Sequence, residues 1–345
     1  MVLHEDNNEE QEEIVLTGRF DVDGLLERFF DGNTAAAARL ISIVENDSEN
    51  SQKVLDAVFP KVRGAYKIGF TGPPGAGKST LVSRLARIFR QEGRAIGVIA
   101  VDPTSPFSGG ALLGDRIRMQ KLTEDPEIFV RSLATRGSLG GISRCTNDVA
   151  DLLDAFGKDL ILVETVGVGQ SELEIAEKAH TVVVVLVPES GDSIQAMKAG
   201  LMEIGDIFVM NKSDHPDSEL AARDLEDTLR LKDIPEDGWR PPVLLTSALE
   251  GAGLETLEEK IKAHYDYLER NGILDEKRRR VLRSRIWEAL LDRVEERLAM
   301  DKEIAELIDR RMEDVLEKKI APYSIVREIE KMIDIVHDWS KEDER

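Results

Sequence analysis

Cysteine, long apolar runs and positive charge are all scarce in this sequence. Its 345 residues include one cysteine, Cys145, so no disulfide can close within the chain, which fits a reducing, cytoplasmic compartment. The longest apolar run, residues 181–188, is far too short to cross a bilayer and instead predicts a buried strand. The acidic first residues lack the basic start and apolar block of a secretory signal or transit peptide, so we expect neither.

Acidic residues dominate the charge balance. The formal net charge of −21 repels nucleic acid and acidic membrane surfaces, so we expect neither as a main partner. The acidic excess is typical of a solubility adaptation, for example to high salt, and it indicates no chemistry. The five histidines are scattered without ligand spacing, so no metal site of histidine and cysteine is predicted. We expect Cys145, which lies in a helical pattern, to be a small buried thiol.

Apolar periodicity predicts an α/β fold. Short apolar runs alternate with helical patterns, which indicates a mostly parallel sheet with helices on both faces. The expected strands are residues 65–70, 95–101, 127–133, 159–164, 181–187, 206–211 and 242–247.

Four parts are expected along the chain: a disordered acidic segment (1–20), a helical extension (21–60), the α/β domain (61–270) and a helical C-terminal arm (271–345). The extension should hold two antiparallel helices joined at residues 31–33. The arm carries three apolar stripes, at residues 282–298, 304–316 and 325–336, the last after Pro322. Each stripe needs a covering surface, either the chain's own core or a second copy, and periodicity leaves both open.

The segment GPPGAGKS, residues 72–79, matches G-x-x-x-x-G-K-[ST] between a predicted strand and a predicted helix. Its glycines let backbone amides surround phosphate oxygens, Lys78 supplies a charge to the β- and γ-phosphates, and the Ser79 hydroxyl is placed to bind Mg²⁺. The fold is therefore predicted to be that of a P-loop NTPase. The expected nucleotide contacts here are Gly72, Pro73, Pro74, Gly75, Ala76, Gly77, Lys78, Ser79 and Thr80.

The sequence NKSD at the end of a later predicted strand indicates guanine as the base. The Asp214 carboxylate can accept from both guanine N1–H and the exocyclic amine, and adenine offers neither donor there. The Lys212 stem can lie along the base, and Asn211 can brace the loop. Ser247 and Ala248 close the last predicted strand and suit a loop that touches guanine O6. The predicted ligands are GTP and GDP.

Long segments of the chain resemble the methylmalonyl-CoA mutase-associated GTPases, a branch of the SIMIBI class of P-loop GTPases. The matching segments are GFTGPPGAGKST, AVDPTSPFSGGALLGDRIRM, VETVGVGQSE and GDSIQAMKAGLMEIGD followed by NKSD. The resemblance covers residues 22–338. It implies a GTP-hydrolysing chaperone for an adenosylcobalamin-dependent acyl-CoA mutase such as methylmalonyl-CoA mutase, which gates cofactor loading and protects the mutase from inactivation. It also implies a homodimer formed through the C-terminal helices.

Acidic residues near the expected phosphate site supply metal ligands. Asp102, Asp115 and Glu164 are candidates for holding Mg²⁺ directly or through water, with Glu164 as the Walker B carboxylate. Gly167 can offer its amide to the γ-phosphate. The segment 103–114 is rich in glycine, serine and proline, so it is either a switch loop ordered by nucleotide or a plain surface loop.

Hydrolysis by this core alone should be slow. Ras-like enzymes carry a water-orienting glutamine where this chain has Val168. The resemblance implies that a third switch, Asp192, Gln195 and Lys198, supplies the missing groups and that Lys198 meets the transition-state charge when the partner binds. Lys78 and Glu164 complete the predicted catalytic set.

Two other functions fit the P-loop. A small-molecule kinase, the older description of this family as arginine/ornithine transport kinases, is disfavoured by NKSD because kinases usually prefer ATP. A nickel or cobalt metallochaperone GTPase is disfavoured because the cysteine and histidine motifs of such proteins are missing.

Overall fold

The computed structural model describes residues 21–46, 50–102, 122–134, 145–165, 171–188 and 200–332. The chain consists of two compact units, residues 1–275 and 276–345. The expected partition at residues 20, 60 and 270 stays a prediction. No helix in the described ranges is both long and apolar enough to span a membrane.

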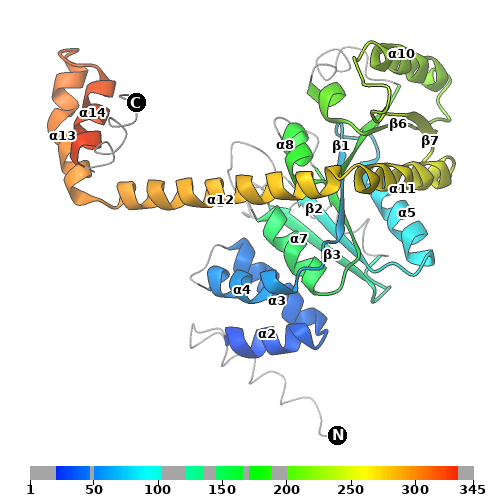
Figure 1. The fold of residues 1–345 in the computed structure, drawn as a ribbon, viewed down its shortest axis with the longest axis horizontal. Helices are drawn as coiled ribbons and strands as arrows, with labels where there is room; N and C mark the ends of the chain where they lie inside the picture. Colours follow the sequence, from blue (N-terminus) through cyan, green and yellow to red (C-terminus); the bar gives the residue numbers. More distant parts are fainter. Residues whose placement is uncertain are drawn as a thin grey trace, which may run out of the picture. The chain divides into compact units, whose positions relative to one another are not determined.

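A seven-stranded sheet forms the centre of the first unit, with strand order β3-β2-β4-β1-β5-β6-β7 (Figure 1). Every neighbouring pair is parallel, as expected for strands separated by helices. All of the predicted strands are confirmed, with ends shifted by one residue at most. They are β1 (Tyr66–Thr71), β2 (Ile96–Asp102), β3 (Ile128–Ala134), β4 (Leu160–Glu164), β5 (Thr181–Leu186), β6 (Ile207–Asn211) and β7 (Val243–Thr246).

Helices cover both faces of this sheet and create two separate apolar layers (Figure 1). Successive residues of a strand point to opposite faces, so Val183 joins one layer and Val184 the other. One layer contains α5 (Lys78–Gln91) and α11 (Leu254–Arg270). The other layer contains α7 (Thr146–Ala155), α8 (Ser171–Lys178) and α10 (Ser218–Arg230). The α/β fold with a sheet between helical layers is therefore confirmed.

The N-terminal helices belong to the second of these layers. The expected pair is present as α2 (Val22–Phe30) and α3 (Thr34–Glu45), and each begins at a side-chain cap, Asp21 and Asn33 respectively. A third helix, α4 (Ser51–Val58), and a short 3₁₀ turn (Phe59–Lys61) were not predicted. The helix α4 has only eight residues and two fully buried apolar side chains, Val54 and Val58, so it is too short for a periodicity to be recognised.

The three C-terminal stripes fall on α12 (Ile273–Ala299), α13 (Lys302–Leu316) and α14 (Pro322–Met332). In the second unit α13 and α14 pack together through buried Ile304, Leu307 and Ile325. An ion pair at 2.7 Å from Arg311 to Glu328 ties the same two helices. The last part of the third stripe, residues 333–336, lies outside the described residues.

Candidate functional site

The P-loop connects β1 to α5 at the carboxyl edge of the sheet. Its glycines Gly72, Gly75 and Gly77 have φ values of 131°, 77° and 91°, and residues other than glycine rarely adopt such positive φ angles. A Cβ atom on Gly72 would lie 2.0 Å from the Val185 carbonyl oxygen of β5. The loop therefore curls tightly over the strand ends, and only glycine permits this path.

Two of the predicted site residues, Lys78 and Ser79, begin α5. The buried Lys78 donates from Nζ to the carbonyl oxygens of Gly72 and Pro73, at 2.7 and 3.0 Å. These bonds hold the ammonium within the curl of the loop, where the phosphates are expected. The Ser79 hydroxyl donates to Glu164 Oε1 at 2.6 Å, and Glu164 is the buried last residue of β4. A hydroxyl and a carboxylate thus meet beside the P-loop, and both are oxygen donors of the kind that Mg²⁺ prefers.

Asn211 connects the P-loop to the last strand. From the end of β6 its amide donates to the Ala76 carbonyl at 2.7 Å, and its Oδ1 accepts from Thr246 Oγ1 at 3.1 Å and from the Ala248 amide at 3.0 Å. The side chain is 2% exposed, so water cannot replace these bonds. One buried amide therefore sets the spacing between the phosphate loop and the segment expected to contact the base.

The residues expected to read the base lie together at the ends of β6 and β7. Lys212 adopts φ 60°, which turns the chain sharply after β6. The Ser213 amide then donates to the Thr246 carbonyl at 2.9 Å, which brings the two loops side by side. The Ser247 hydroxyl donates to Asp214 Oδ1 at 3.4 Å. The Asp214 carboxylate is thereby oriented beside the 247–249 loop.

A cavity of about 590 Å³ joins these groups. This volume suits a nucleotide-sized ligand. Among the residues predicted from the sequence, its lining includes Pro74, Gly75, Gly77, Lys78, Ser79, Thr80, Glu164, Asn211, Lys212, Asp214, Ser247 and Ala248. Gly72, Pro73 and Ala76 stand behind the lining, where their carbonyls hold the side chains of Lys78 and Asn211.

Several predicted residues are not placed. Asp102 ends β2, a neighbour of β4, and only its backbone is described. The other predicted residues outside the described ranges are Asp115, Gly167, Asp192, Gln195 and Lys198. Their roles stay predictions.

Four residues of the cavity lining were missed by the sequence reasoning: Ala100, Val101, Thr165 and Leu249. Thr165 follows Glu164 and donates from Oγ1 to Thr71 Oγ1 at 3.2 Å, which ties the end of β4 to the end of β1. Leu249 is 79% exposed, and its carbonyl accepts from Arg84 Nη2 at 2.7 Å. A leucine directly after the predicted contacts Ser247 and Ala248 was the available signal in the sequence for a wall of the candidate base site.

Comparisons with known proteins agree with this geometry. The family model of the "Methylmalonyl Co-A mutase-associated GTPase MeaB" matches residues 37–303. A Pyrococcus abyssi protein whose description names a GTPase is 52% identical over 267 residues, covering 77% of this chain and 82% of that protein. The mouse "Methylmalonic aciduria type A homolog, mitochondrial" is 32% identical over 319 residues, covering 87% and 77%. A solved "LAO/AO transport system kinase" superposes with a TM-score of 0.68 at 26% identity, covering 91% of this chain and 97% of that one.

Proposed function

Because the chain belongs to the methylmalonyl-CoA mutase-associated GTPase family and is a GTPase, we propose that it serves as the GTP-hydrolysing chaperone of an adenosylcobalamin-dependent acyl-CoA mutase. In this role it gates cofactor loading and prevents inactivation of the mutase. The observation that carries the proposal is that the P-loop and the loop of Asp214 line one shared cavity. The family description and the mouse relative's name support methylmalonyl-CoA mutase as the client. A cytoplasmic location is part of the proposal.

In the proposed mechanism, the chain's own groups first fix the nucleotide. Backbone amides within residues 72–79, other than those of Pro73 and Pro74, which carry no N–H, receive the phosphates together with the dipole of α5, and Lys78 adds a localised positive charge. Asp214 selects guanine by accepting from two donors that adenine lacks. Ser79 and Glu164 would hold Mg²⁺, with Asp102 and Asp115 as further predicted ligands directly or through water. When bound, Mg²⁺ neutralises charge on the β- and γ-phosphates.

Hydrolysis is proposed to depend on the partner. Val168 offers no group to orient water, so the isolated chain should hydrolyse GTP slowly. Gln195 and Lys198 of the third switch, three residues apart, would share one face of a helix. We propose that the mutase moves this segment so that Lys198 stabilises the transition state, while Asp192 and Gln195 position the segment and the water.

A homodimer completes the proposal. The helix α12 carries large apolar side chains that are mostly exposed, including Ile286, Trp287 and Leu291 at 68%, 58% and 61%. Such a stripe on a charged helix supports pairing with a second copy. Light scattering should give twice the 38.5 kDa mass of one chain.

The decisive experiment measures GTP hydrolysis by the full chain with and without purified methylmalonyl-CoA mutase. The mutase should stimulate the rate, and Lys198→Ala should remove the stimulation while GTP affinity stays near normal. Lys260→Ala changes an exposed lysine on α11 and is the matched control that should keep full stimulation. Full stimulation of the Lys198 variant would contradict its role, and no response of the wild type would contradict the chaperone proposal. Transfer of radiolabelled γ-phosphate to arginine or ornithine would instead support a kinase activity, as in the name of the solved relative.

A further inference from the structure

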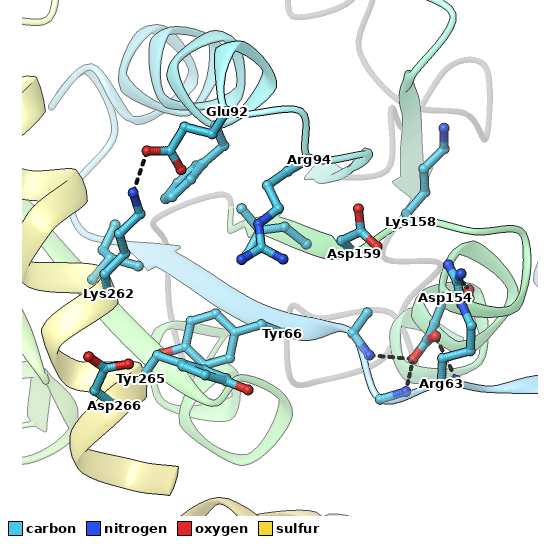
Figure 2. A pocket seen from close by; sticks show the side chains of 15 residues that line it. Arg63, Tyr66, Glu92, Arg94, Asp154, Lys158, Asp159, Lys262, Tyr265 and Asp266 are labelled. Carbon is cyan, nitrogen blue, oxygen red and sulfur yellow. Dashed lines mark hydrogen bonds and ion pairs between the residues drawn. The ribbon is translucent and has the colours of Figure 1, made fainter.

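A second cavity, of about 520 Å³, lies at the opposite edge of the sheet, where β1, β2 and β4 begin (Figure 2). Its walls come from the entry to β1, the end of α5, the connection from α7 to β4, and α11. It shares no lining residue with the nucleotide cavity. Its volume falls in the range of small-molecule sites.

The charge of this cavity differs from that of the chain. The lining has four basic residues, Arg63, Arg94, Lys158 and Lys262, and four acidic residues, Glu92, Asp154, Asp159 and Asp266. The whole chain has 67 acidic residues against 46 lysines and arginines. The cavity is therefore locally neutral within a strongly acidic protein, so it repels an anion less than the average surface does.

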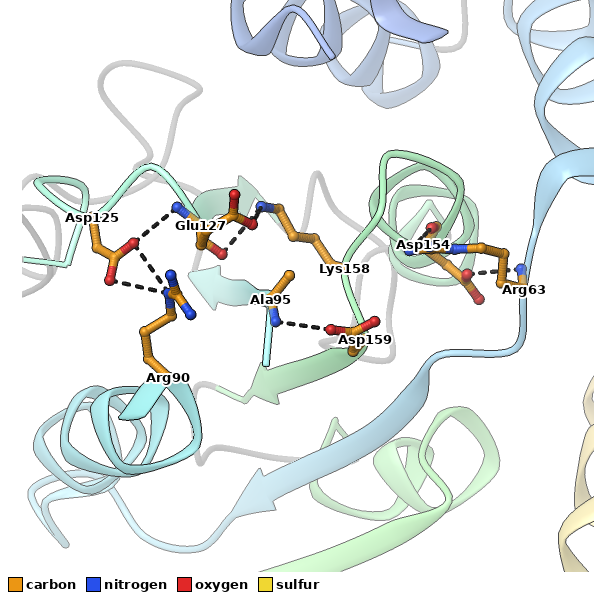
Figure 3. Close-up of polar contacts among 8 residues, drawn as sticks. All are labelled: Arg63, Arg90, Ala95, Asp125, Glu127, Asp154, Lys158 and Asp159. Carbon is orange, nitrogen blue, oxygen red and sulfur yellow. Dashed lines mark hydrogen bonds and ion pairs between the residues drawn. The ribbon is translucent and has the colours of Figure 1, made fainter. Parts of the chain in front are cut away.

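Hydrogen bonds within the protein already engage two of the acidic groups (Figure 3). The Asp154 carboxylate is buried and accepts from the three successive amides of residues 63–65, at 2.6 to 2.8 Å. Asp159 accepts from the Ala95 amide at 2.9 Å. These bonds fix the backbone before β1 and β2, so both carboxylates stabilise the walls of the cavity.

The other two acidic groups also have basic partners. Lys262 donates to Glu92 and keeps the pKa of that carboxyl below its ordinary value, so Glu92 stays ionised beside this lysine. Asp266 lies 3.4 Å from Arg270 across one turn of α11. A cationic ligand would have to compete with these pairs.

Among the basic groups, two arginines have donors to spare. Lys158 is buried and donates to the Glu127 carbonyl at 3.1 Å (Figure 3). The Arg63 guanidinium makes one long bond, 3.4 Å, to the Asp154 carbonyl. The Arg94 side chain makes no hydrogen bond or ion pair with any residue that the structure describes, and it points into the cavity (Figure 2). A guanidinium carries five N–H donors in a fork that matches a carboxylate or a phosphate.

An aromatic wall lines the cavity near Arg94 (Figure 2). The rings of Tyr66 and Tyr265 meet edge to face with centroids 4.6 Å apart, and Phe89, Leu160 and Ile261 extend the apolar surface. The Tyr66 hydroxyl is bound to Thr181 in the core, and burial raises the pKa of this phenol. Tyr66 therefore lines the cavity with its aromatic ring, which suits a flat or apolar group.

We propose that this cavity is a second ligand site, which binds a small organic anion: a carboxylate or phosphate carried on an aromatic or apolar body. Arg94 binds the anionic group, and the rings of Tyr265 and Tyr66 contact the body. The site is separate from the nucleotide cavity and does not depend on the proposed chaperone function.

The test uses the full chain saturated with GDP and Mg²⁺, so that phosphate probes cannot enter the P-loop. Isothermal titration calorimetry measures benzoate, phenyl phosphate and inorganic phosphate in separate arms. We expect benzoate or phenyl phosphate to bind, and phenyl phosphate to bind more tightly than inorganic phosphate. Arg94→Gln should weaken this binding about tenfold or more, because it removes a charge-assisted hydrogen bond donor. Arg87→Gln, an exposed position of α5 outside the cavity, is the matched control and should bind as the wild type does.

A Tyr265→Leu variant separates the ring contact from the charge. It should reduce the preference for phenyl phosphate over inorganic phosphate and leave the affinity for inorganic phosphate unchanged. Tighter binding of benzoate would identify a carboxylate ligand, and tighter binding of phenyl phosphate a phosphate ester. The proposal is overturned if neither organic probe binds at about 10 mM, a bound set by the weakest affinities of specific sites. It is equally overturned if Arg94→Gln and Arg87→Gln bind them alike.

Discussion

Replacing Asn211 with alanine should destabilise the protein and the candidate nucleotide site together. The substitution removes three hydrogen bonds at once, to the Ala76 carbonyl, the Thr246 hydroxyl and the Ala248 amide. All three partner residues are buried, at 0%, 0% and 3% exposure, so each group loses its bond without gaining one to water.

The expected loss follows from these contacts. At about 1 kcal/mol for each bond, the free energy of unfolding should fall by about 3 kcal/mol, and more if the groups left behind carry the full cost of desolvation. That is a large share of the total free energy of unfolding of a typical protein, which is roughly 5–15 kcal/mol. GTP affinity should fall as well, because Asn211 holds the Ala76 turn of the P-loop against the Ala248 loop.

Urea unfolding followed by circular dichroism measures the first effect, and titration with GTP the second. Asn271→Ala is the matched control, since Asn271 is exposed and makes a single bond, to the Tyr267 carbonyl at 2.8 Å. It should cost less than about 1 kcal/mol. An Asn211 variant with the stability of this control, and with unchanged GTP affinity, would refute the bracing role.

Three further outcomes are expected. Asp214→Asn should weaken GTP binding about tenfold or more and reduce the preference over ATP, as titration with both nucleotides would reveal, because the amide cannot accept from both guanine donors; an unchanged preference contradicts the assignment. Gly72→Ala should lower the thermal unfolding temperature more than Gly75→Ala, because a Cβ meets a main-chain oxygen at 2.0 Å at the first position and nothing within 4 Å at the second. Equal effects would argue against the close approach of the loop to β5. The free energy of unfolding should also fall in acid, because Lys262 lowers the pKa of Glu92 below its ordinary value of 4.5. The stabilisation that the ionised Glu92 provides is complete above pH 4.5 and is lost as the pH drops through the lowered pKa. Lys262→Gln should remove that part of the pH dependence of unfolding.

Local patterns were sufficient to predict the strands and the phosphate loop. A buried parallel strand appears as a continuous apolar run, and β4, β5 and β6 are buried along their whole length. The P-loop was equally readable, because its positive φ values require glycine at fixed spacing. Such features depend on neighbours in the chain, and they leave a signature in the order of residues. The helix α4 left none, because eight residues are too few to display a periodicity.

The sequence by itself therefore determined the fold class and the position of the phosphate loop, and it predicted Asn211, Lys212 and Asp214 as the residues that read the base, from a short motif at a strand end. Only the tertiary structure decided which strands are neighbours and which motifs share a cavity. The bond from Asn211 to Ala76 spans 135 positions, and that from Asp154 to Ala65 spans 89. No local pattern encodes contacts at such separations, because they arise from the packing of whole elements. The cavity around Arg94 arises in the same way, since its walls come from four segments that are separate in the sequence.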